Sequence, residues 1–319
     1  MINFARRAVD LLAHRIAYIL SRKGQDAQLE LLGRLLSKQN ASLTEIQHLS
    51  DVEFKVYSQW GEDGIIDWLV SKLPGIPEKF IEFGVEDYYE SNTRFLMMHR
   101  NWRGMVMDGS EKNMRVCQNS HYYWRYGLKA VTAFITAENI NALITEHGFG
   151  GEIGILSVDI DGNDYWVWKQ IEAASPWIVI AEYNAVLGDL YPITIPYQPN
   201  FSRLQGHYSG QYFGSSIMAL ELCASEKGYT LIGSNLVGNN AFFVRNDLLS
   251  NFSGVKDKRA KPSRFRDARD EGGLLTFTEG MDRIKLIREC KVVNVSTGES
   301  HKLGDFDKIY SDYWMSLIN

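Results

Sequence analysis

Ile155-Leu-Ser-Val-Asp-Ile-Asp-Gly-Asn-Asp-Tyr165 is the stretch of sequence that decides the fold. Its apolar, largely β-branched residues up to Ile160 indicate a buried strand of a parallel sheet. Packed like charges repel, so a buried strand seldom ends in a run of carboxylates for structural reasons alone. In open α/β sheets the ligand crevice lies just outside the carboxyl ends of the strands. The stretch therefore indicates a binding or active site at its acidic end, Asp159, Asp161, Asn163 and Asp164.

Strand-like and helix-like segments alternate on both sides of this stretch. Helical spacing is clear at residues 138–147 and 165–173. Between such segments, short apolar runs favour strands at residues 80–83, 104–108, 128–134, 153–160 and 177–183. This alternation predicts an α/β fold with a parallel sheet and right-handed crossovers.

The last part of this region predicts a helix followed by an antiparallel hairpin. Residues 215–226 have a helical pattern, and Gly228 is suited to end that helix. Residues 229–232 and 240–245 then flank a segment rich in glycine and asparagine, which is typical of a hairpin turn. We expect five α/β units, one further helix and this hairpin.

The first 54 residues differ from this central region. Basic residues alternate with an apolar stripe at helical spacing before residue 24, and a second helical stretch follows at 29–36. We favour helices that pack on the main domain or on a second subunit, which would give a homo-oligomer. A basic amphipathic helix can instead lie on an anionic membrane surface. The stripe consists of Phe4, Val9, Leu11, Leu12, Ile16, Ile19 and Leu20.

Residues 251–319 form a basic insertion and a C-terminal appendage. The basic segment, residues 254–271, is either a solvated loop or a clamp for a phosphorylated or anionic substrate. In the second case Arg264, Arg266 or Arg269 would make the contacts. The appendage ends in an aromatic cluster at Tyr310, Tyr313 and Trp314.

The composition is that of an ordinary globular protein with a substantial core, because 45% of the 319 residues are hydrophobic and 23% are charged. A net charge of −5 gives no indication of nucleic-acid binding. Cys117, Cys223 and Cys290 form neither a CxxC motif nor a disulfide framework, which fits a reducing cytoplasm. No apolar run reaches the roughly 18 residues of a membrane span, and no secretory signal peptide is recognisable. We expect a cytoplasmic protein.

Three features near the predicted strand ends indicate a nucleoside ligand. Gly84 lets the backbone turn tightly beneath a ligand, and Glu82 can accept a hydrogen bond from an ammonium or hydroxyl group. Asp108 ends the second strand, where an acidic residue can bind both ribose hydroxyls. It is alternatively a surface turn residue, since Asp-Gly pairs are common in turns. Ala133 and its neighbours after the third strand leave room for an adenine ring.

With these features in order, the sequence resembles the class I S-adenosylmethionine-dependent methyltransferases, and more closely their FkbM-like branch. The resemblance covers roughly residues 55–250. It implies a doubly wound, seven-stranded, mostly parallel sheet with a C-terminal antiparallel hairpin. It also implies methyl transfer, often to a hydroxyl group of a sugar or glycan. The motifs that carry it are Ser58-Gln-Trp-Gly-Glu-Asp-Gly64, Val158-Asp-Ile-Asp-Gly-Asn-Asp164 and Ile180-Ala-Glu-Tyr-Asn184.

By position, the resemblance implies a role for individual residues in binding S-adenosylmethionine. Glu82 and Gly84 would border its methionine part, and Asp108 would hold its ribose. One departure concerns the loop after the first strand, where the usual second glycine is missing and Val85-Glu-Asp-Tyr-Tyr-Glu90 is bulkier and more acidic. The full set of implied cofactor contacts is Gln59, Glu62, Glu82, Gly84, Asn92, Asp108, Gly109, Ser110, Ala133 and Asp159.

The acidic strand end allows three interpretations. In the first, Asp159 contacts the amino end of the cofactor, and Asp161 or Asp164 orients or deprotonates the acceptor hydroxyl. In the second, Asp161 joins Glu182 and Asn184 to hold Mg²⁺, which prefers such hard oxygen ligands. That arrangement is similar to metal-dependent O-methyltransferases such as the catechol enzymes. In the third, residues 161–164 cap the helix that follows.

His207 is the candidate histidine for a general base, since the long connection after the fifth strand should overhang the site. A purely structural histidine is the alternative. Aromatic residues in the same connection either bind a sugar or fill the pocket: Tyr191, Tyr197, Phe201, Tyr208, Tyr212 and Phe213.

We therefore expect an O-methyltransferase whose acceptor is a sugar, a nucleotide-sugar or a glycan. A non-catalytic methyltransferase-like binding module and another nucleotide-dependent enzyme on a doubly wound fold are the alternatives. The absence of a GxGxxG motif argues against a nicotinamide dehydrogenase.

Overall fold

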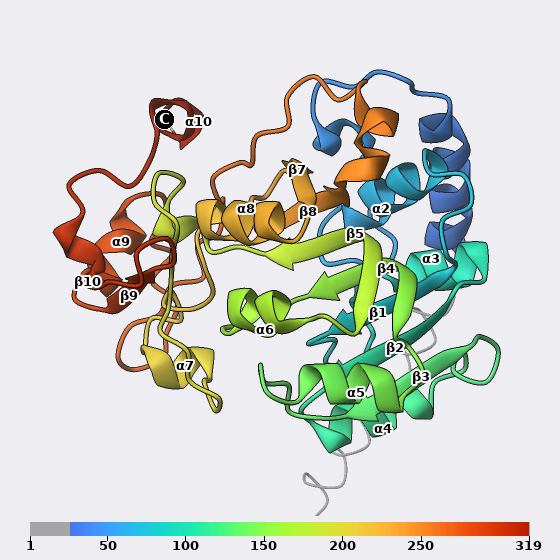
Figure 1. The fold of residues 1–319 in the computed structure, drawn as a ribbon, viewed down its shortest axis with the longest axis horizontal. Helices are drawn as coiled ribbons and strands as arrows, with labels where there is room; N and C mark the ends of the chain where they lie inside the picture. The colour runs from blue at the N-terminus through green and yellow to red at the C-terminus, as the bar shows by residue number, and fades with distance from the viewer. Residues whose placement is uncertain (1–25, 319) are drawn as a thin grey trace, which may run out of the picture.

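The computed structural model describes residues 26–318, and its central feature is a seven-stranded sheet (Figure 1). The strand order is β3-β2-β1-β4-β5-β8-β7. The five strands β1 to β5 pair in parallel, whereas β8 is antiparallel to both β5 and β7. The strands are β1 (Lys79–Phe83), β2 (Arg103–Asp108), β3 (Leu128–Thr132), β4 (Gly151–Val158), β5 (Ala174–Glu182), β7 (Tyr229–Ser234) and β8 (Asn240–Arg245).

This arrangement confirms the expected fold class. It is a doubly wound, mostly parallel α/β sheet that closes with an antiparallel hairpin, as the resemblance to class I methyltransferases implied. Strand β8 has the predicted range 240–245, and β7 begins at the predicted residue 229 but continues to Ser234 instead of ending at 232. All three cysteines are free, which agrees with the absence of a disulfide framework.

Both faces of the sheet are buried, because side chains alternate across it and helices cover each side. On β1, Phe80 packs into one hydrophobic cluster and Ile81 into the other; on β4, Ile155 and Leu156 divide in the same way. Helices α2 (Glu62–Ser71), α3 (Arg94–Arg100) and α4 (Glu111–Gln118) supply the first cluster. Helices α5 (Ile140–Glu146), α6 (Asp164–Gln170) and α8 (Ile217–Glu226) supply the second.

A helix at residues 26–41 precedes the sheet and contains the predicted helical stretch 29–36. Its inward face is made of small or polar residues, because Gly33, Ser37 and Asn40 are buried. A Cβ atom at Gly33 would press against Val56 and Phe95, so this glycine permits the close packing. The outward side carries a row of leucines with exposed fractions between 39% and 61%, at Leu29, Leu31, Leu32, Leu35 and Leu36.

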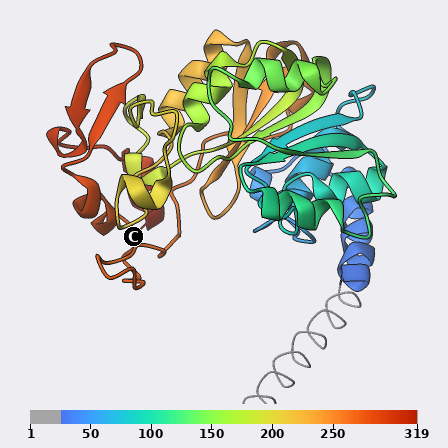
Figure 2. The same cartoon turned by 90° about the horizontal axis from the view of Figure 1, so that it is seen from below.

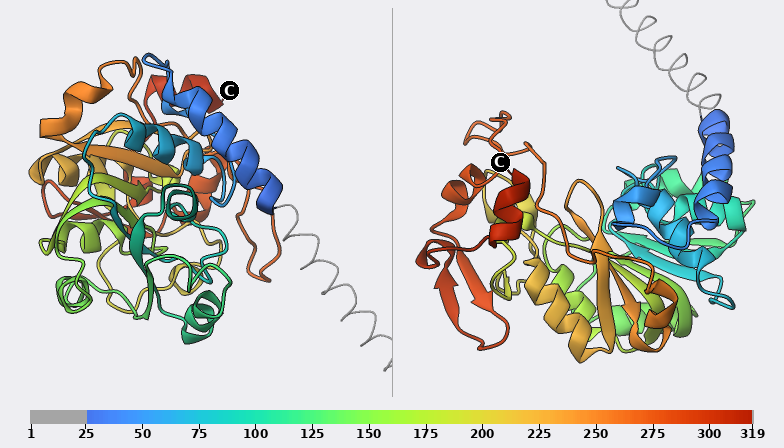
Figure 3. Two further views of the ribbon diagram at one scale, coloured as in Figure 1. Left: turned by 90° about the vertical axis from the view of Figure 1, so that its right-hand side faces the viewer. Right: turned by 90° about the horizontal axis from the view of Figure 1, so that it is seen from above.

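This helix lies at the end of the molecule opposite the C-terminal appendage (Figure 3). An outward row of leucines is what packing on a second subunit would require, and oligomerisation through this region stays a prediction. The first predicted helix, before residue 24, lies outside the described residues. No helix within residues 26–318 is both long and apolar enough to cross a membrane.

The C-terminal region lies beyond the carboxyl ends of β4 and β5, the side to which their arrowheads point (Figures 1 and 2). A second, three-stranded antiparallel sheet joins it to the connection after β5, since β6 (Ile193–Thr194) from that connection pairs with β9 (Lys291–Asn294). Strand β10 (Ser300–Lys302) completes this sheet. The remaining elements are α7 (Arg203–Gly206), α9 (Asp282–Ile287), α10 (Asp312–Ile318) and the short 3-10 helices η1 (Leu49–Val52), η2 (Ala185–Leu187), η3 (Asn246–Phe252) and η4 (Leu303–Asp305).

Aromatic side chains near the C-terminus belong to the same core cluster as the main sheet. Tyr310 and Trp314 are both 1% exposed and pack in the cluster that contains Tyr183, the residue after β5. The indole Nε1 of Trp314 donates a hydrogen bond to the carbonyl oxygen of Ala260 at 2.8 Å. The basic segment and α10 are thereby joined across the appendage.

We expect Trp314→Ala to lower the free energy of unfolding by about 3–5 kcal/mol, because it empties a buried site and leaves the Ala260 carbonyl without its donor. Urea unfolding followed by circular dichroism measures the difference. Leu317→Ala, on the same helix but 42% exposed, is the control and should stay within about 0.5 kcal/mol of the unmodified protein. Equal losses in the two variants would show that α10 is not anchored by Trp314.

Candidate active site

A cavity of about 800 Å³ opens at the carboxyl ends of the central strands. Gly84 follows β1, Asp108 ends β2, Asp159 follows β4 and Glu182 ends β5, and all four residues line it. Its volume falls within the range of small-molecule sites, and its position is the one expected for ligands of open α/β sheets. Eight of the ten residues predicted to contact a cofactor are in the lining: Gln59, Glu82, Gly84, Asn92, Asp108, Gly109, Ala133 and Asp159.

Gly84 lets the ends of β1 and β4 come together. Its φ is +68°, and a Cβ atom there would overlap the carbonyl oxygen of Asp159. The two residues at 86 and 88 are also left-handed, with φ of 47° at Glu86 and 62° at Tyr88. Such a backbone is uncommon and strained for non-glycine residues, and strained residues of this kind cluster at active sites and ligand clamps. The loop 85–90, which lacks the usual second glycine, therefore turns through strained residues instead.

Asp108 holds this loop against the second strand. Its carboxylate accepts hydrogen bonds from the backbone N–H groups of Glu86 (3.0 Å) and Ser110 (2.7 Å). Each carboxylate oxygen has a further lone pair, so the side chain can still accept hydrogen bonds from a ligand in the cavity. Ser110 lies outside the lining, where its hydroxyl oxygen caps α4 by accepting from Asn113 N–H at 3.3 Å.

Glu82 is buried and fixes the start of α3 to the end of β1. It accepts hydrogen bonds from the backbone N–H groups of Asn92 (2.7 Å) and Thr93 (3.1 Å). Burial raises the pKa of Glu82 to about 7 despite these bonds. The Asn92 amide in turn donates a hydrogen bond to the Ser157 hydroxyl on β4 at 3.1 Å, so hydrogen bonds connect the start of α3 to both β1 and β4.

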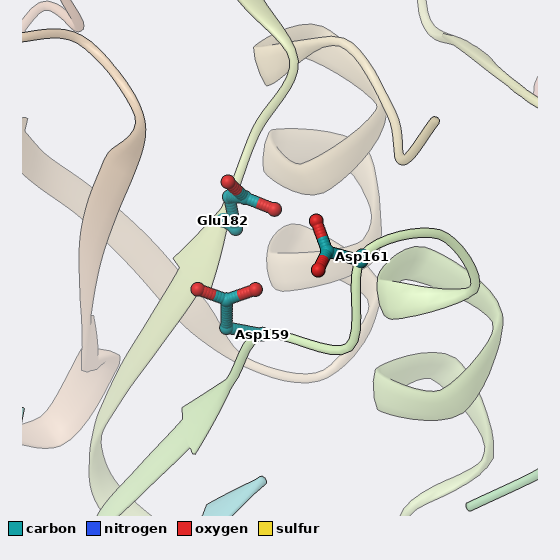
Figure 4. Close-up of side chains that lie close together, drawn as sticks. All are labelled: Asp159, Asp161 and Glu182. Atoms are coloured by element: carbon teal, nitrogen blue, oxygen red, sulfur yellow. The ribbon is translucent and has the colours of Figure 1, made fainter. Parts of the chain in front are cut away.

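Asp159, Asp161 and Glu182 form an acidic cluster, in which one carboxylate oxygen of each lies within 4.8 Å of the others. Figure 4 shows the three side chains pointing toward one another from the ends of β4 and β5. Burial, and then repulsion by the neighbouring carboxylates, raises the pKa values of Asp159 and Glu182 well above the ordinary range. One oxygen of Glu182, Oε2, is buried without a hydrogen-bond partner.

Arg203 is the cation that neutralises part of this cluster. Its guanidinium pairs with Asp161 at 3.0 Å and with Asp267 at 2.9 Å, and it lies 3.8 Å from the centre of the Phe213 ring. Arg203 comes from α7, in the connection after β5, and this connection overhangs the site as predicted. The residue that it places beside the acidic cluster is an arginine and not the predicted His207. Sequence reasoning missed Arg203, and the only available signal was a basic residue somewhere in that long connection.

Two predicted catalytic residues lie away from the lining of this cavity. Asp164 is fully buried and accepts hydrogen bonds from the backbone N–H groups of Ile160 (2.7 Å) and Gly162 (2.9 Å) at the start of α6. These bonds fix the turn before α6, whereas Asn163, the N-cap residue of the helix, makes no side-chain capping hydrogen bond. His207 has its Nδ1 2.8 Å from the Ser209 hydroxyl, and burial lowers its pKa.

Asn184 and Glu62 are likewise engaged within the protein. The Asn184 amide donates to the carbonyl oxygens of Gln211 (2.8 Å) and Phe213 (3.0 Å), and its oxygen accepts from Val186 N–H (3.0 Å). The structure therefore groups Asp159, rather than Asn184, with Asp161 and Glu182. Glu62 is fully buried outside the lining and accepts hydrogen bonds from the side chains of Asn235 (2.6 Å) and Asn240 (3.0 Å), which fixes the hairpin turn.

A second cavity of about 510 Å³ adjoins the first and shares Gln59, Glu182 and Arg203 with it. The connection after β5 contributes Phe213 to this second cavity, whereas it contributes Phe201 to the first. Much of the remaining wall comes from the basic segment and α9. Its aromatic and charged lining includes Trp60, Phe213, Phe265, Phe277, Arg266, Asp267 and Arg283.

No model of a known protein family matches the sequence, and no curated protein matches it either. Among solved structures, the chain is similar to the pyocyanin biosynthetic protein PhzM, with a TM-score of 0.33 and 12% identity. That match covers 54% of this chain and 52% of PhzM, so it spans about half the length of that protein. The chain is also similar to the O-methyltransferase from Bacillus cereus in complex with SAH, with a TM-score of 0.35 and 14% identity over 68% of this chain and 89% of that one. Likenesses this remote leave the function to the geometry of the site.

The acidic cluster has a consequence for stability. Asp159 and Glu182 keep their protons in the folded protein at pH values where the unfolded chain has lost them. The folded state therefore binds more protons, and the free energy of unfolding should fall as the pH rises from about 4 toward neutrality. Urea unfolding in EDTA at a series of pH values measures this slope.

Asp159→Asn should flatten the slope, because it removes one raised pKa and relieves Glu182. Glu111→Gln is the matched control, since Glu111 is exposed on α4 and forms an ion pair with Arg115. If the pH dependence of the free energy of unfolding is the same in Asp159→Asn as in the unmodified protein, the cluster is not protonated in the folded protein.

Proposed function

We propose that this protein is a cytoplasmic S-adenosylmethionine-dependent O-methyltransferase of the FkbM-like branch, which acts on a hydroxyl group of a sugar, nucleotide-sugar or glycan. One observation carries the proposal. A single cavity at the carboxyl ends of a methyltransferase-type sheet is lined by the Gly84 turn, by Asp108 and by the acidic cluster.

The larger cavity suits the cofactor. Asp108 has lone pairs left for the two ribose hydroxyls, and Ala133 offers a small side chain beside them. S-adenosylmethionine carries positive charge on its sulfonium and its amino group, and the many carboxylates of the lining attract such charge. Two further buried oxygens without partners, Asn163 Oδ1 and Asn240 Oδ1, belong to lining residues and can accept hydrogen bonds from an ammonium group.

The acidic cluster suits the chemistry of methyl transfer to oxygen. The acceptor oxygen forms a bond to the methyl carbon while the carbon–sulfur bond breaks and its electron pair stays on sulfur. The hydroxyl proton must leave, and Glu182 in its deprotonated form can accept it at Oε2, an oxygen that has no partner; the raised pKa makes that carboxylate a stronger base. Arg203 and Asp161 would orient the acceptor, and in-line alignment supplies much of the rate.

The same cluster has the donor set of a divalent metal site. Asp159, Asp161 and Glu182 offer three carboxylates, one of them with a buried oxygen that lacks a partner. Mg²⁺ held there would lower the pKa of the acceptor hydroxyl. Arg203 already supplies one positive charge beside Asp161, which supports the metal-free alternative.

Calorimetry with S-adenosylhomocysteine tests the cofactor. Binding is expected, and Asp108→Ala should weaken it about tenfold or more, because a hydrogen bond to a charged group contributes about 1.5–3 kcal/mol. Glu111→Ala, the exposed neighbour on α4, should bind as the unmodified protein does. Absence of binding by the folded protein would refute the proposal and favour a methyltransferase-like module without a cofactor.

Calorimetry with Mg²⁺, in the presence of S-adenosylhomocysteine and after EDTA treatment, tests the metal. If the cluster holds the ion, Glu182→Gln should abolish binding and Glu86→Gln, a lining residue outside the cluster, should keep it. If titration of Mg²⁺ into the unmodified protein gives no heat of binding, or does not saturate, the metal site is excluded and Arg203 is the counterion of the cluster. The cofactor proposal would then still stand.

A further inference from the structure

Arg283 is a buried cation that has no anionic partner among residues 26–318. It lies on α9, is 2% exposed and lines the second cavity. Within residues 26–318, no carboxylate oxygen comes within 4.0 Å of its guanidinium. Burying an unpaired charge is costly, and arginine does not escape that cost by losing its proton.

The hydrogen bonds of Arg283 hold the guanidinium in place but leave part of it free. Nε donates to the carbonyl oxygen of Gly280 at 3.3 Å, and the two Nη atoms donate to the hydroxyl (3.3 Å) and carbonyl (3.2 Å) oxygens of Ser263. All of these acceptors are neutral. A guanidinium has five N–H donors, so these three bonds do not use them all.

In the second cavity the charge of Asp267 acts favourably on Arg283 without a direct contact, and the charge of Arg203 acts against it. Asp267 accepts from Arg203 at 2.9 Å and from Gln211 at 3.0 Å, so its carboxylate is already engaged. Glu182 belongs to the acidic cluster beside Arg203. Arg266 adds a further positive charge, and its nearest carboxylate, Glu279, is an exposed partner at 3.5 Å. An exposed pair of this kind is weak and open to exchange.

Aromatic side chains complete the cavity. Trp60 and Phe265 have ring centres 5.4 Å apart, and Phe277 is 62% exposed in the same lining. Flat apolar surfaces of this kind pack against sugar or base rings. The cavity therefore joins an apolar wall to two arginines, and it meets the acidic cluster through Glu182 and Arg203.

We propose that the methyl acceptor carries an anionic group, a phosphate or a carboxylate, and that Arg283 and Arg266 bind it in the second cavity. This inference rests on the proposed function, since it takes the second cavity as the acceptor half of the site. Guanidinium groups bind such oxyanions through paired hydrogen bonds. A nucleotide-sugar, a sugar phosphate or a sugar acid fits this cavity, whereas a neutral glycan leaves Arg283 unpaired.

Binding of three matched probes tests the inference. Glucose 1-phosphate, glucuronate and glucose are titrated separately into the protein saturated with S-adenosylhomocysteine, and calorimetry measures each dissociation constant. We expect at least one of the two anionic probes to bind ten times or more tightly than glucose. The dissociation constants of glucose 1-phosphate and glucuronate, compared with each other, show whether the site prefers a phosphate or a carboxylate.

Variants locate the binding. Arg266→Ala should weaken the preferred anionic probe about tenfold, whereas Arg264→Ala should not change it. Arg264 is the matched control, because it is an exposed arginine two positions away that lies outside the lining of the second cavity. Arg283→Lys and Arg283→Met are compared in the same way, with circular dichroism to check that each variant folds. If Arg283→Met does not fold, the Arg266 and Arg264 pair decides.

Equal affinity for glucose and both anions, no binding of either anion, or equal losses in Arg264→Ala and Arg266→Ala would overturn the inference. Failure of the proposed function is a separate result, since the cofactor titration reports it without any acceptor probe. The protein could also bind an anion through Arg266 and Arg283 and yet fail to bind S-adenosylhomocysteine. That result would confirm the anion site but exclude a role for it in methyl transfer.

Discussion

Mutual repulsion among Asp159, Asp161 and Glu182 is the constraint on which the rest of this site depends. The sheet brings the three together because β4 and β5 are parallel neighbours that end at the same edge. The fold accommodates this in two ways. Arg203 crosses from the overhanging connection to pair with Asp161, and the pKa values of Asp159 and Glu182 rise, so that protons offset charge. Carboxyl groups whose pKa values are raised by burial and by neighbouring charges are often found where proteins exchange protons.

Acidic residues that the sequence does not distinguish have different roles in three dimensions. Asp164 and Glu62 belong to the same motifs as Asp161 and Gln59, yet both carboxylates are fully buried and bind amide groups of the protein. The chain thus uses some of its carboxylates as fixed structural acceptors and reserves others for the cavity. A buried carboxylate with good amide donors is stable without a counterion, whereas one facing a cavity requires a partner from elsewhere.

The sheet and the position of the site could be predicted from the sequence, because both depend on local patterns. Apolar runs mark the strands, and Gly84, Asp108 and Asp159 each follow or end one of them. The residues that balance the charges could not be predicted. Arg203 meets Asp161 across 42 positions of sequence and Asp267 across 64, and Arg283 is bound by Ser263 in another segment. No periodicity or motif records such contacts, since they depend on how the appendage folds back over the sheet.

Arg203 stands between the acidic cluster and the basic segment, with one Nη atom on Asp161 and the other on Asp267. Asp267 lies within residues 254–271, the part of the chain that forms much of the second cavity. Exchanging that segment for one from another protein, in order to change what the second cavity binds, would also remove the carboxylate that holds Arg203 in place. The wall of the second cavity and the acidic cluster therefore have to be engineered together, and a transplanted segment has to bring its own partner for this arginine.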